Sequence, residues 1–135
     1  MPDSSIDMNE TTATRRQRGE RIAAKLSRNP NPALLEVLDQ NFPFLANTLT
    51  SYAVGEVLAR TVLDVRARQL ALVAAMGALG LSDELKIHAG YALNSGVSEE
   101  ELKEIVYLIT IPAGFPRAIQ AARAVSELLA SRKEQ

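Results

Sequence analysis

Apolar residues recur every three or four positions along most of the chain, the spacing that places them on one face of an α-helix. The clearest case follows Ser98, where Leu102, Ile105, Val106 and Ile109 stand at i, i+3, i+4 and i+7. No segment alternates between apolar and polar residues as a half-buried strand does, and none repeats like a solenoid. The pattern predicts an all-α fold, a single-domain bundle of six or seven helices.

Turn-forming and capping residues divide this pattern into segments. The expected helices are Arg15–Ser27, a segment from Pro32 that Pro43 interrupts, Phe44 to about Ala59, Val65–Leu79, a segment from Ser82 closed by Asn94-Ser95-Gly96, a segment from Ser98 ended by Pro112 and Gly114, and a last helix from Pro116. Asp64, Ser82 and Ser98 are the expected N-caps, because a short polar side chain can accept hydrogen bonds from the exposed amides of a first turn. Glu101 would complete a capping box with Ser98.

The two ends of the chain differ from its middle. Residues 1–14 are rich in Ser, Thr, Asp and Asn and have no periodicity, which predicts a disordered N-terminal arm. Residues 15–131 form the predicted helical domain, and the tail from Ser131 should fray. The basic segment Arg15–Ser27 is interpreted as a solvated face, with binding of a partner as the alternative.

Two of the expected helices differ in their predicted burial. The segment Val65–Leu79 is apolar on nearly all sides after Arg68, which predicts a central helix that is buried on most sides. In the segment from Phe44, the apolar stripe is Leu45, Leu49, Tyr52, Ala53 and Val57. Glu56 falls on this apolar side, an unusual position for a carboxylate, because an unpaired buried charge is costly.

Composition excludes several classes of function. The chain of 135 residues has no cysteine, and therefore no disulfide and no thiolate zinc site. Its net charge of -1 argues against a nucleic-acid partner. The N-terminus has no apolar signal region, and no segment is apolar enough for a membrane span, so we expect no membrane partner and a cytoplasmic location.

The single histidine, His88, is the leading candidate for chemistry, since its ordinary pKa suits proton transfer near neutrality. On an ideal helix it shares a face with Leu81, Glu84, Leu85, Tyr91, Ala92 and Ser95, whereas Lys86 and Ala89 face elsewhere. His88 should therefore point into the core or into a pocket. The alternative is a structural core histidine that bonds to a backbone carbonyl.

Two charged residues are secondary candidates. Glu56 would orient or protonate His88, or act as an acid itself; alternatively, it forms a salt bridge with Arg60, Arg66 or Arg68. The planar guanidinium of Arg68 would suit a substrate carboxylate, and a structural ion pair is the alternative.

No metal or cofactor motif is recognisable. One histidine without cysteine or HExxH spacing offers too few ligands for zinc. Gly77 and Gly80 do not form a dinucleotide-binding loop, and neither a phosphate-binding loop nor a GxSxG motif is present. We therefore expect no metal and no cofactor.

A set of short motifs resembles the carboxymuconolactone decarboxylase family. These are Tyr-Ala-x-Gly-Glu at 52–56, Leu-Asp-x-Arg-x-Arg at 63–68, Ala-Leu-Gly at 78–80, Glu-Leu-x-x-His at 84–88, Ala-x-Asn-x-Gly-Val at 92–97, Glu-Glu-Leu-Lys-Glu at 100–104 and Ala-Gly-Phe-Pro-Arg-Ala at 113–118. The resemblance covers about residues 42–129. It implies an all-helical fold of the alkylhydroperoxidase D-like type and a homo-oligomer, often a trimer or hexamer. Leu81 and Glu84 stand where the peroxidase branch has its two cysteines, which excludes thiol peroxidase activity.

The resemblance also implies a reaction, the cofactor-free release of CO2 from a small carboxylated lactone in aromatic-acid catabolism. His88 would be the acid/base and Glu56 its catalytic partner. Arg68, Asn94 and Tyr52 would be the substrate contacts. The expected partner is thus a small carboxylate or lactone.

Four positions depart from the family's decarboxylases, which tend to have tryptophan near Val54 and Leu58, and a polar residue and tyrosine in place of Leu108 and Pro112. These departures make the pocket more apolar. A different lactone or acid is therefore an alternative substrate. A lactone isomerase and a non-catalytic, oligomeric module that binds a small acid are alternative functions.

Overall fold

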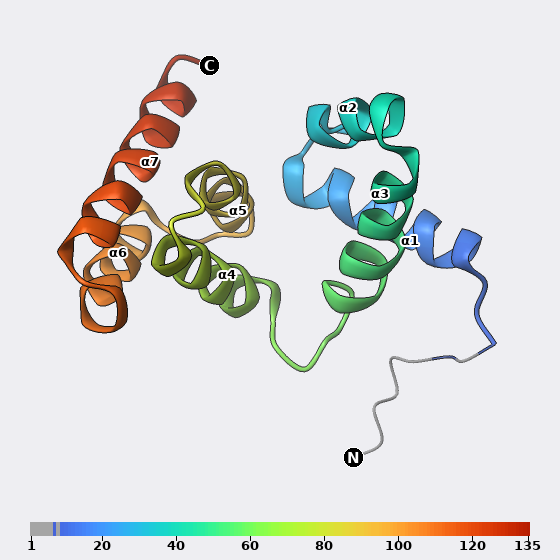
Figure 1. Ribbon diagram of the computed structural model, residues 1–135, viewed down its shortest axis with the longest axis horizontal. Helices are drawn as coiled ribbons and strands as arrows, with labels where there is room; N and C mark the ends of the chain where they lie inside the picture. Colours follow the sequence, from blue (N-terminus) through green and yellow to red (C-terminus); the bar gives the residue numbers. More distant parts are fainter. Residues whose placement is uncertain (1–6, 8) are drawn as a thin grey trace. The chain divides into compact units, whose positions relative to one another are not determined.

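The computed structural model describes residue 7 and residues 9–135, which divide into two compact units, Met1–Leu63 and Asp64–Gln135 (Figure 1). The described residues form seven α-helices, one π-helix and no strand. The predicted all-α fold is therefore confirmed. Half of the predicted N-terminal arm, residues 1–6 and 8, lies outside the described residues.

The first unit contains α1 (Thr12–Ser27), α2 (Ala33–Asn41), α3 (Pro43–Thr48) and the π-helix η1 (Leu49–Val57). Helix α1 begins within the predicted arm, because the side chain of Thr11 accepts a hydrogen bond from the Thr14 amide, 3.1 Å away, and caps the first turn. The predicted break at Pro43 is confirmed: α2 ends before Phe42, and Pro43 takes the first position of α3. Pro32 lies one residue before α2 rather than in its first turn.

The π-helix η1 corrects the prediction of an α-helix from Phe44 to about Ala59. Its buried residues form two adjacent pairs four positions apart, Thr50 with Ser51 and Val54 with Gly55. Three members of the predicted apolar stripe, Leu45, Tyr52 and Val57, are exposed. The wider turn of a π-helix, with hydrogen bonds from each amide to the fifth preceding carbonyl, redistributes the side chains around the axis.

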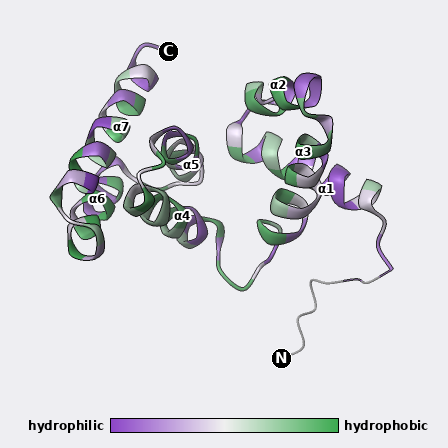
Figure 2. Cartoon of the chain, in the orientation of Figure 1, coloured by the Kyte–Doolittle hydropathy of each residue, from purple (hydrophilic) through white to green (hydrophobic). Residues whose placement is uncertain are grey.

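Helices α1 and η1 pack with their backbones in close approach. A Cβ atom placed on Gly19 would lie 1.9 Å from the Thr50 carbonyl oxygen, and one on Gly55 would lie 2.3 Å from the Arg15 carbonyl oxygen. Each helix thus contributes one glycine to the crossing, because no larger residue fits there. The largely hydrophilic α1 (Figure 2) packs against η1 through this close and extensive contact.

The second unit contains α4 (Val65–Leu79), α5 (Ser82–Asn94), α6 (Glu99–Ala113) and α7 (Phe115–Lys133). Helices α4 and α7 each pack against the other three helices of the unit. The core is built from small and aliphatic side chains: Val73, Leu85, Ala89, Ala92, Val97, Leu102, Val106, Ile109, Ala118, Ala121, Ala124 and Val125. Alanine lets these helices approach closely, and burial of the aliphatic side chains stabilises the unit.

Two of the predicted N-caps in the second unit are confirmed. The Asp64 carboxylate accepts from the Ala67 amide at 2.7 Å. Ser98 and Glu101 form the capping box, in which each side chain accepts a hydrogen bond from the backbone of the other. The third was wrong by one residue: Leu81 precedes α5, and Ser82 is already its first helical residue.

Two prolines occupy helix positions other than those predicted, Pro112 near the end of α6 and Pro116 near the start of α7. Pro112 lies inside α6, which continues through Ala113 before Gly114 ends it at φ 81°. Pro116 is the second residue of α7 rather than the first, which is compatible with its missing amide because first-turn amides have no partner within the helix. Helix α7 continues into the predicted tail and ends at Lys133.

Helix α4 is buried on one side only, which corrects the prediction of burial on most sides. Its buried residues are Gln69, Val73 and Gly77, one turn apart, whereas Leu79 is exposed. Figure 2 shows that the helix begins hydrophilic and then becomes hydrophobic. Within the described residues, no helix combines the length and the apolar run that crossing a bilayer requires.

Candidate functional site

His88 lies on α5 at the edge of the core of the second unit. The buried stripe of α5 is formed by Leu85, Ala89, Gly90 and Ala92. The prediction that Ala89 faces away from the core was therefore wrong. The face of α5 that packs against the neighbouring helices includes Ala89. His88 borders this stripe and is half-buried.

The partner of His88 is Gln69 on α4, whose Oε1 lies 2.8 Å from Nδ1 of the imidazole. An amide oxygen only accepts hydrogen bonds, so Nδ1–H is the donor, and the neutral ring carries its lone pair on Nε2. Gln69 is 1% exposed, so it is held by the core. The predicted alternative of a backbone carbonyl partner does not describe this contact, which is made by a side-chain amide.

Sequence reasoning missed Gln69. The signal was present, because Gln69, Val73 and Gly77 recur every four residues as the buried stripe of α4. A polar residue on such a stripe requires a hydrogen-bond partner. The interpretation of this helix as apolar on all sides concealed that requirement.

Burial sets the charge state of His88. The pKa of the imidazole is lowered from its ordinary value of 6.5 because burial penalises the charged form. Tyr91, on the next turn of α5, packs edge-on against the ring with the two centroids 5.3 Å apart and an interplanar angle of 76°. Burial also raises the pKa of the Tyr91 hydroxyl. His88 is therefore neutral near pH 7, with Nε2 as its basic atom.

Glu56 lies in the last turn of η1, in the first unit, and is half-buried. Its Oε1 is 2.7 Å from Nε of Arg15 on α1. A salt bridge was the predicted alternative for Glu56, with other partners named, and one of those, Arg66, instead contacts Glu101 at 2.7 Å. Tyr52 lies one turn earlier on η1 and is exposed.

The remaining predicted substrate contacts lie on the second unit. Arg68 is half-buried in the first turn of α4 and directly precedes Gln69. Asn94 is the last residue of α5, and its Oδ1 accepts a hydrogen bond from Nη2 of Arg132 at 3.2 Å. The predicted site residues thus divide between the units, with Arg68, His88 and Asn94 on the second and Tyr52 and Glu56 on the first.

The four positions that depart from the family's decarboxylases also divide between the units. Val54 is buried on η1, and Leu58 is half-buried directly after it. Leu108 and Pro112 are exposed on α6. Leu108 and Pro112 stand one turn apart on that helix, so any effect they have on a ligand is exerted from a single face.

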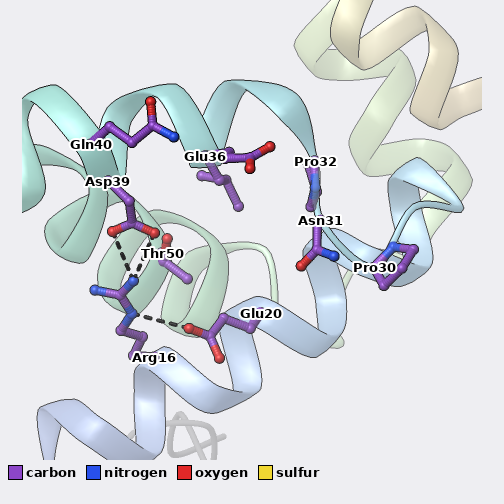
Figure 3. Close-up of a pocket in the computed structure, with 10 residues that line it drawn as sticks. Arg16, Glu20, Pro30, Asn31, Pro32, Glu36, Asp39, Gln40 and Thr50 are labelled. Carbon is purple, nitrogen blue, oxygen red and sulfur yellow. Dashed lines mark hydrogen bonds and ion pairs between the residues drawn. The ribbon is translucent and has the colours of Figure 1, made fainter.

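The first unit has a pocket of about 480 Å³ (Figure 3) that contains none of the predicted site residues. It is lined by Arg16, Glu20, Pro30, Asn31, Pro32, Leu35, Glu36, Asp39, Gln40 and Thr50. Arg16 pairs with Asp39 at 3.0 Å and with Glu20 at 3.1 Å, so the arginine is already engaged by carboxylates. The described residues contain no cluster of three or more histidine, aspartate or glutamate side chains that would hold a metal ion.

Comparison with known proteins gives a consistent result. A family model described as the carboxymuconolactone decarboxylase family matches residues 43–127. A protein of Acinetobacter baylyi named 4-carboxymuconolactone decarboxylase is 35% identical over 98 residues, which cover 73% of this chain and 72% of the relative. An uncharacterized protein of Methanocaldococcus jannaschii is 28% identical over 94 residues, 70% of this chain and 87% of the relative. The matched region contains His88, Gln69 and Glu56, whereas α1, α2 and every residue of the pocket except Thr50 precede it.

Proposed function

The chain belongs to the carboxymuconolactone decarboxylase family, and from this premise we propose that it is a cofactor-independent carboxy-lyase acting on a small carboxylated lactone. The observation that carries the proposal is the contact between Nδ1 of His88 and Oε1 of Gln69, at 2.8 Å. This contact supports a fixed, neutral imidazole with a basic Nε2. Such a group suits proton transfer to or from a bound organic acid.

The proposed reaction breaks one carbon–carbon bond and forms one carbon–hydrogen bond. The bond between the substrate carbon and its carboxylate breaks, CO2 departs, and the electron pair enters the conjugated lactone carbonyl as a dienolate. A proton then adds to the dienolate carbon and gives the product. The lactone itself accepts the electrons, so the protein must hold the acid, stabilise the developing oxyanion and deliver the proton.

His88 is the proposed proton donor. Burial keeps it neutral in the free protein, but a bound carboxylate favours the imidazolium, because an opposite charge nearby stabilises the protonated form. Gln69 accepts from Nδ1–H in both forms, so only Nε2 exchanges its proton. The ring can therefore take up a proton as the anionic substrate binds and release it to the dienolate.

The other predicted site residues keep their assigned roles within the proposal. Glu56 is the second acid/base group. Arg68 would hold a substrate carboxylate through its planar pair of donors, and Asn94 and Tyr52 would contact polar atoms of the lactone. Each role is supported by the family resemblance of the motif that contains the residue.

We also propose that the chain forms a homo-oligomer through the outer faces of α6 and the start of α7. Large apolar residues are exposed there: Tyr107, Leu108 and Ile111 on α6, and Phe115 and Ile119 on α7. A group of exposed apolar side chains on neighbouring helices is typical of a protein–protein contact. A second copy of the chain is the occupant that the family resemblance favours.

The test of the catalytic proposal is CO2 release from 4-carboxymuconolactone, the substrate that the relative's name indicates. The wild-type chain should release CO2. Replacement His88→Gln should lower kcat by about 100-fold, the scale of general acid–base catalysis. Lys86→Gln, on the same helix, is the control and should retain kcat.

Three results would contradict this reading in different ways. Full turnover by His88→Gln would remove the imidazole from the mechanism. Thermal stabilisation by the lactone without any product would instead support the non-catalytic binding module. A rearranged lactone that keeps its carboxylate would support the isomerase.

A further inference from the structure

We propose that Arg15, on the N-terminal helix α1, is a positioning residue for Glu56 in the reaction. This inference rests on the proposed function, in which Glu56 is the second acid/base group. Arg15 lies outside the region that matches the family, residues 43–127, whereas Glu56 lies inside it. The N-terminal helix would thus act on the proposed reaction from outside the matched region.

The backbone register of α1 against η1 places Arg15 beside the last turn of the π-helix. Gly55 lies against the carbonyl of Arg15, where a Cβ atom would be only 2.3 Å from its oxygen. Gly19, one turn later on α1, lies in the same way against the carbonyl of Thr50. Because both contacts involve backbone atoms, α1 cannot slide along η1 without a clash, and the position of Arg15 relative to Glu56 is set.

The guanidinium of Arg15 is itself held in place at all three of its nitrogens. Nε donates to Oε1 of Glu56 at 2.7 Å. Nη1 donates to the carbonyl of Glu10 at 2.9 Å, and Nη2 donates to Oγ1 of Thr12 at 3.1 Å. A guanidinium held at all three nitrogens loses little rotamer freedom when it holds a partner, so it can fix the carboxylate in one orientation.

A second arginine secures the backbone of the same turn. Nε of Arg18, three residues after Arg15 on α1, donates to the carbonyl of Gly55 at 2.7 Å. The Arg18 guanidinium is held in turn by both carboxylate oxygens of Glu10. This hydrogen-bonded pair raises the pKa of Arg18 and lowers that of Glu10, so both stay charged near neutrality. Arg18 thus holds the backbone that carries Glu56, and Arg15 holds the side chain.

This arrangement engages one oxygen of Glu56, Oε1, in a short contact with Nε of Arg15. A carboxylate held in this way has a defined oxygen for proton exchange with a substrate. Without Arg15, the side chain would populate several rotamers, and only some would be productive. Loss of Arg15 should therefore lower kcat more than it raises KM.

The test is a double-mutant cycle with Arg15→Gln, Glu56→Gln and the combined variant, measured by kcat and KM for CO2 release. Arg15→Gln should lower kcat about tenfold, with KM changed by less than about threefold. In the Glu56→Gln background, the same replacement should have no further effect on kcat. Arg15→Lys, which retains the charge and a donor nitrogen, should recover part of the loss.

Arg16→Gln is the matched control, because Arg16 is adjacent on α1, has a similar side-chain exposure of 29% against 26% for Arg15, and also forms ion pairs. It should retain kcat. Equal losses in Arg15→Gln and Arg16→Gln would overturn the inference in favour of a general structural role of α1. Independent effects of Arg15→Gln and Glu56→Gln on kcat would overturn it as well.

The wild type, Arg15→Gln, Glu56→Gln and the combined variant should also be unfolded in urea. This measurement tests the contact between Arg15 and Glu56 without any substrate. The two single replacements should lower the unfolding midpoint, and the combined variant should lower it by less than their sum. Additive shifts would overturn the inference whatever the activity. Absence of CO2 release by the wild-type chain would instead remove the proposed function and the catalytic role of Arg15 with it, while the urea cycle would still decide whether Arg15 holds Glu56.

Discussion

Gln69 on α4 fixes the tautomer of His88 on α5, because its buried amide oxygen lies 2.8 Å from Nδ1 of the imidazole. Two helices of one unit are thereby joined through a polar contact at the margin of an aliphatic core. The consequence for chemistry is that Nε2, rather than Nδ1, is the nitrogen that exchanges protons.

Replacing Gln69 tests this relationship. In Gln69→Leu the Nδ1–H of His88 loses its acceptor, and leaving such a buried donor unsatisfied should cost about 1–3 kcal/mol in the free energy of unfolding. In Gln69→Glu a carboxylate replaces the amide, and its negative charge should raise the pKa of His88. Since His88 is the single histidine, its ring signals can be followed by NMR across pH without ambiguity.

The control for the charge effect is Gln120→Glu, which adds a carboxylate on the exposed side of α7. His88 should titrate there as in the wild type. If His88 titrated identically in Gln69→Glu and in the wild type, the contact between Gln69 and His88 would not exist in solution.

Folding stability should depend on pH through His88. The unfolded chain has the ordinary histidine pKa of 6.5, whereas burial lowers the pKa in the folded state. Below pH 6.5 the unfolded chain therefore binds a proton before the folded chain does. The contribution of the neutral imidazole is fully present above pH 6.5 and is lost as the pH falls toward the lowered folded-state value.

Urea unfolding at pH 7.5 and pH 5.5 measures this dependence. Carboxylates also titrate at acidic pH, so the relevant quantity is the difference between the wild type and His88→Gln. The wild type should lose more stability than the variant between the two values. An equal loss would show that burial does not perturb His88.

The space around three glycines predicts opposite outcomes for their replacement by alanine. Gly19→Ala and Gly55→Ala would place Cβ atoms at 1.9 and 2.3 Å from backbone oxygens, so each should destabilise the protein by about 1–3 kcal/mol or more. Gly90→Ala is the control within α5, because its Cβ would meet Leu128 at an ordinary 3.9 Å. It should stabilise the helix by about 0.5–1 kcal/mol. Urea unfolding of the three variants distinguishes these results, and a tolerated Gly19→Ala would argue against the backbone contact.

The proposed oligomer contact predicts that Ile111→Glu weakens self-association. Ile111 is 82% exposed in the chain, and a charge buried there between copies would be costly. Val62→Glu is the matched control, with an exposure of 85% in the connection between the two units. Light scattering coupled to gel filtration should give a smaller mass for Ile111→Glu than for the wild type and Val62→Glu. Equal masses would exclude this face as the contact.

Local patterns predicted those parts of the fold that depend on neighbouring residues. The cap at Asp64 and the box formed by Ser98 and Glu101 bond to amides three residues away, so their geometry follows from the helix itself. The break at Pro43 follows in the same way from the missing amide. The π-helix between Leu49 and Val57 was not predicted from local patterns, because its apolar spacing was interpreted as that of an α-helix.

The candidate site shows the same difference between what local sequence predicts and what only the tertiary structure reveals. The sequence by itself identified His88 and Glu56, since one is the single histidine and the other a carboxylate in an apolar stretch. Their partners, Gln69 and Arg15, lie 19 and 41 residues away along the chain and were not predicted.

Sequence alone therefore determined the helical class, the bounds of α4 and the candidate catalytic residues, because hydrogen bonds within a helix join residues three to five positions apart. Only the tertiary structure decided the π-helix, the buried face of α5 and the partners of His88 and Glu56. Those features depend on how helices cross, and the crossing is set by the packing of whole helices, such as the glycine contact between α1 and η1.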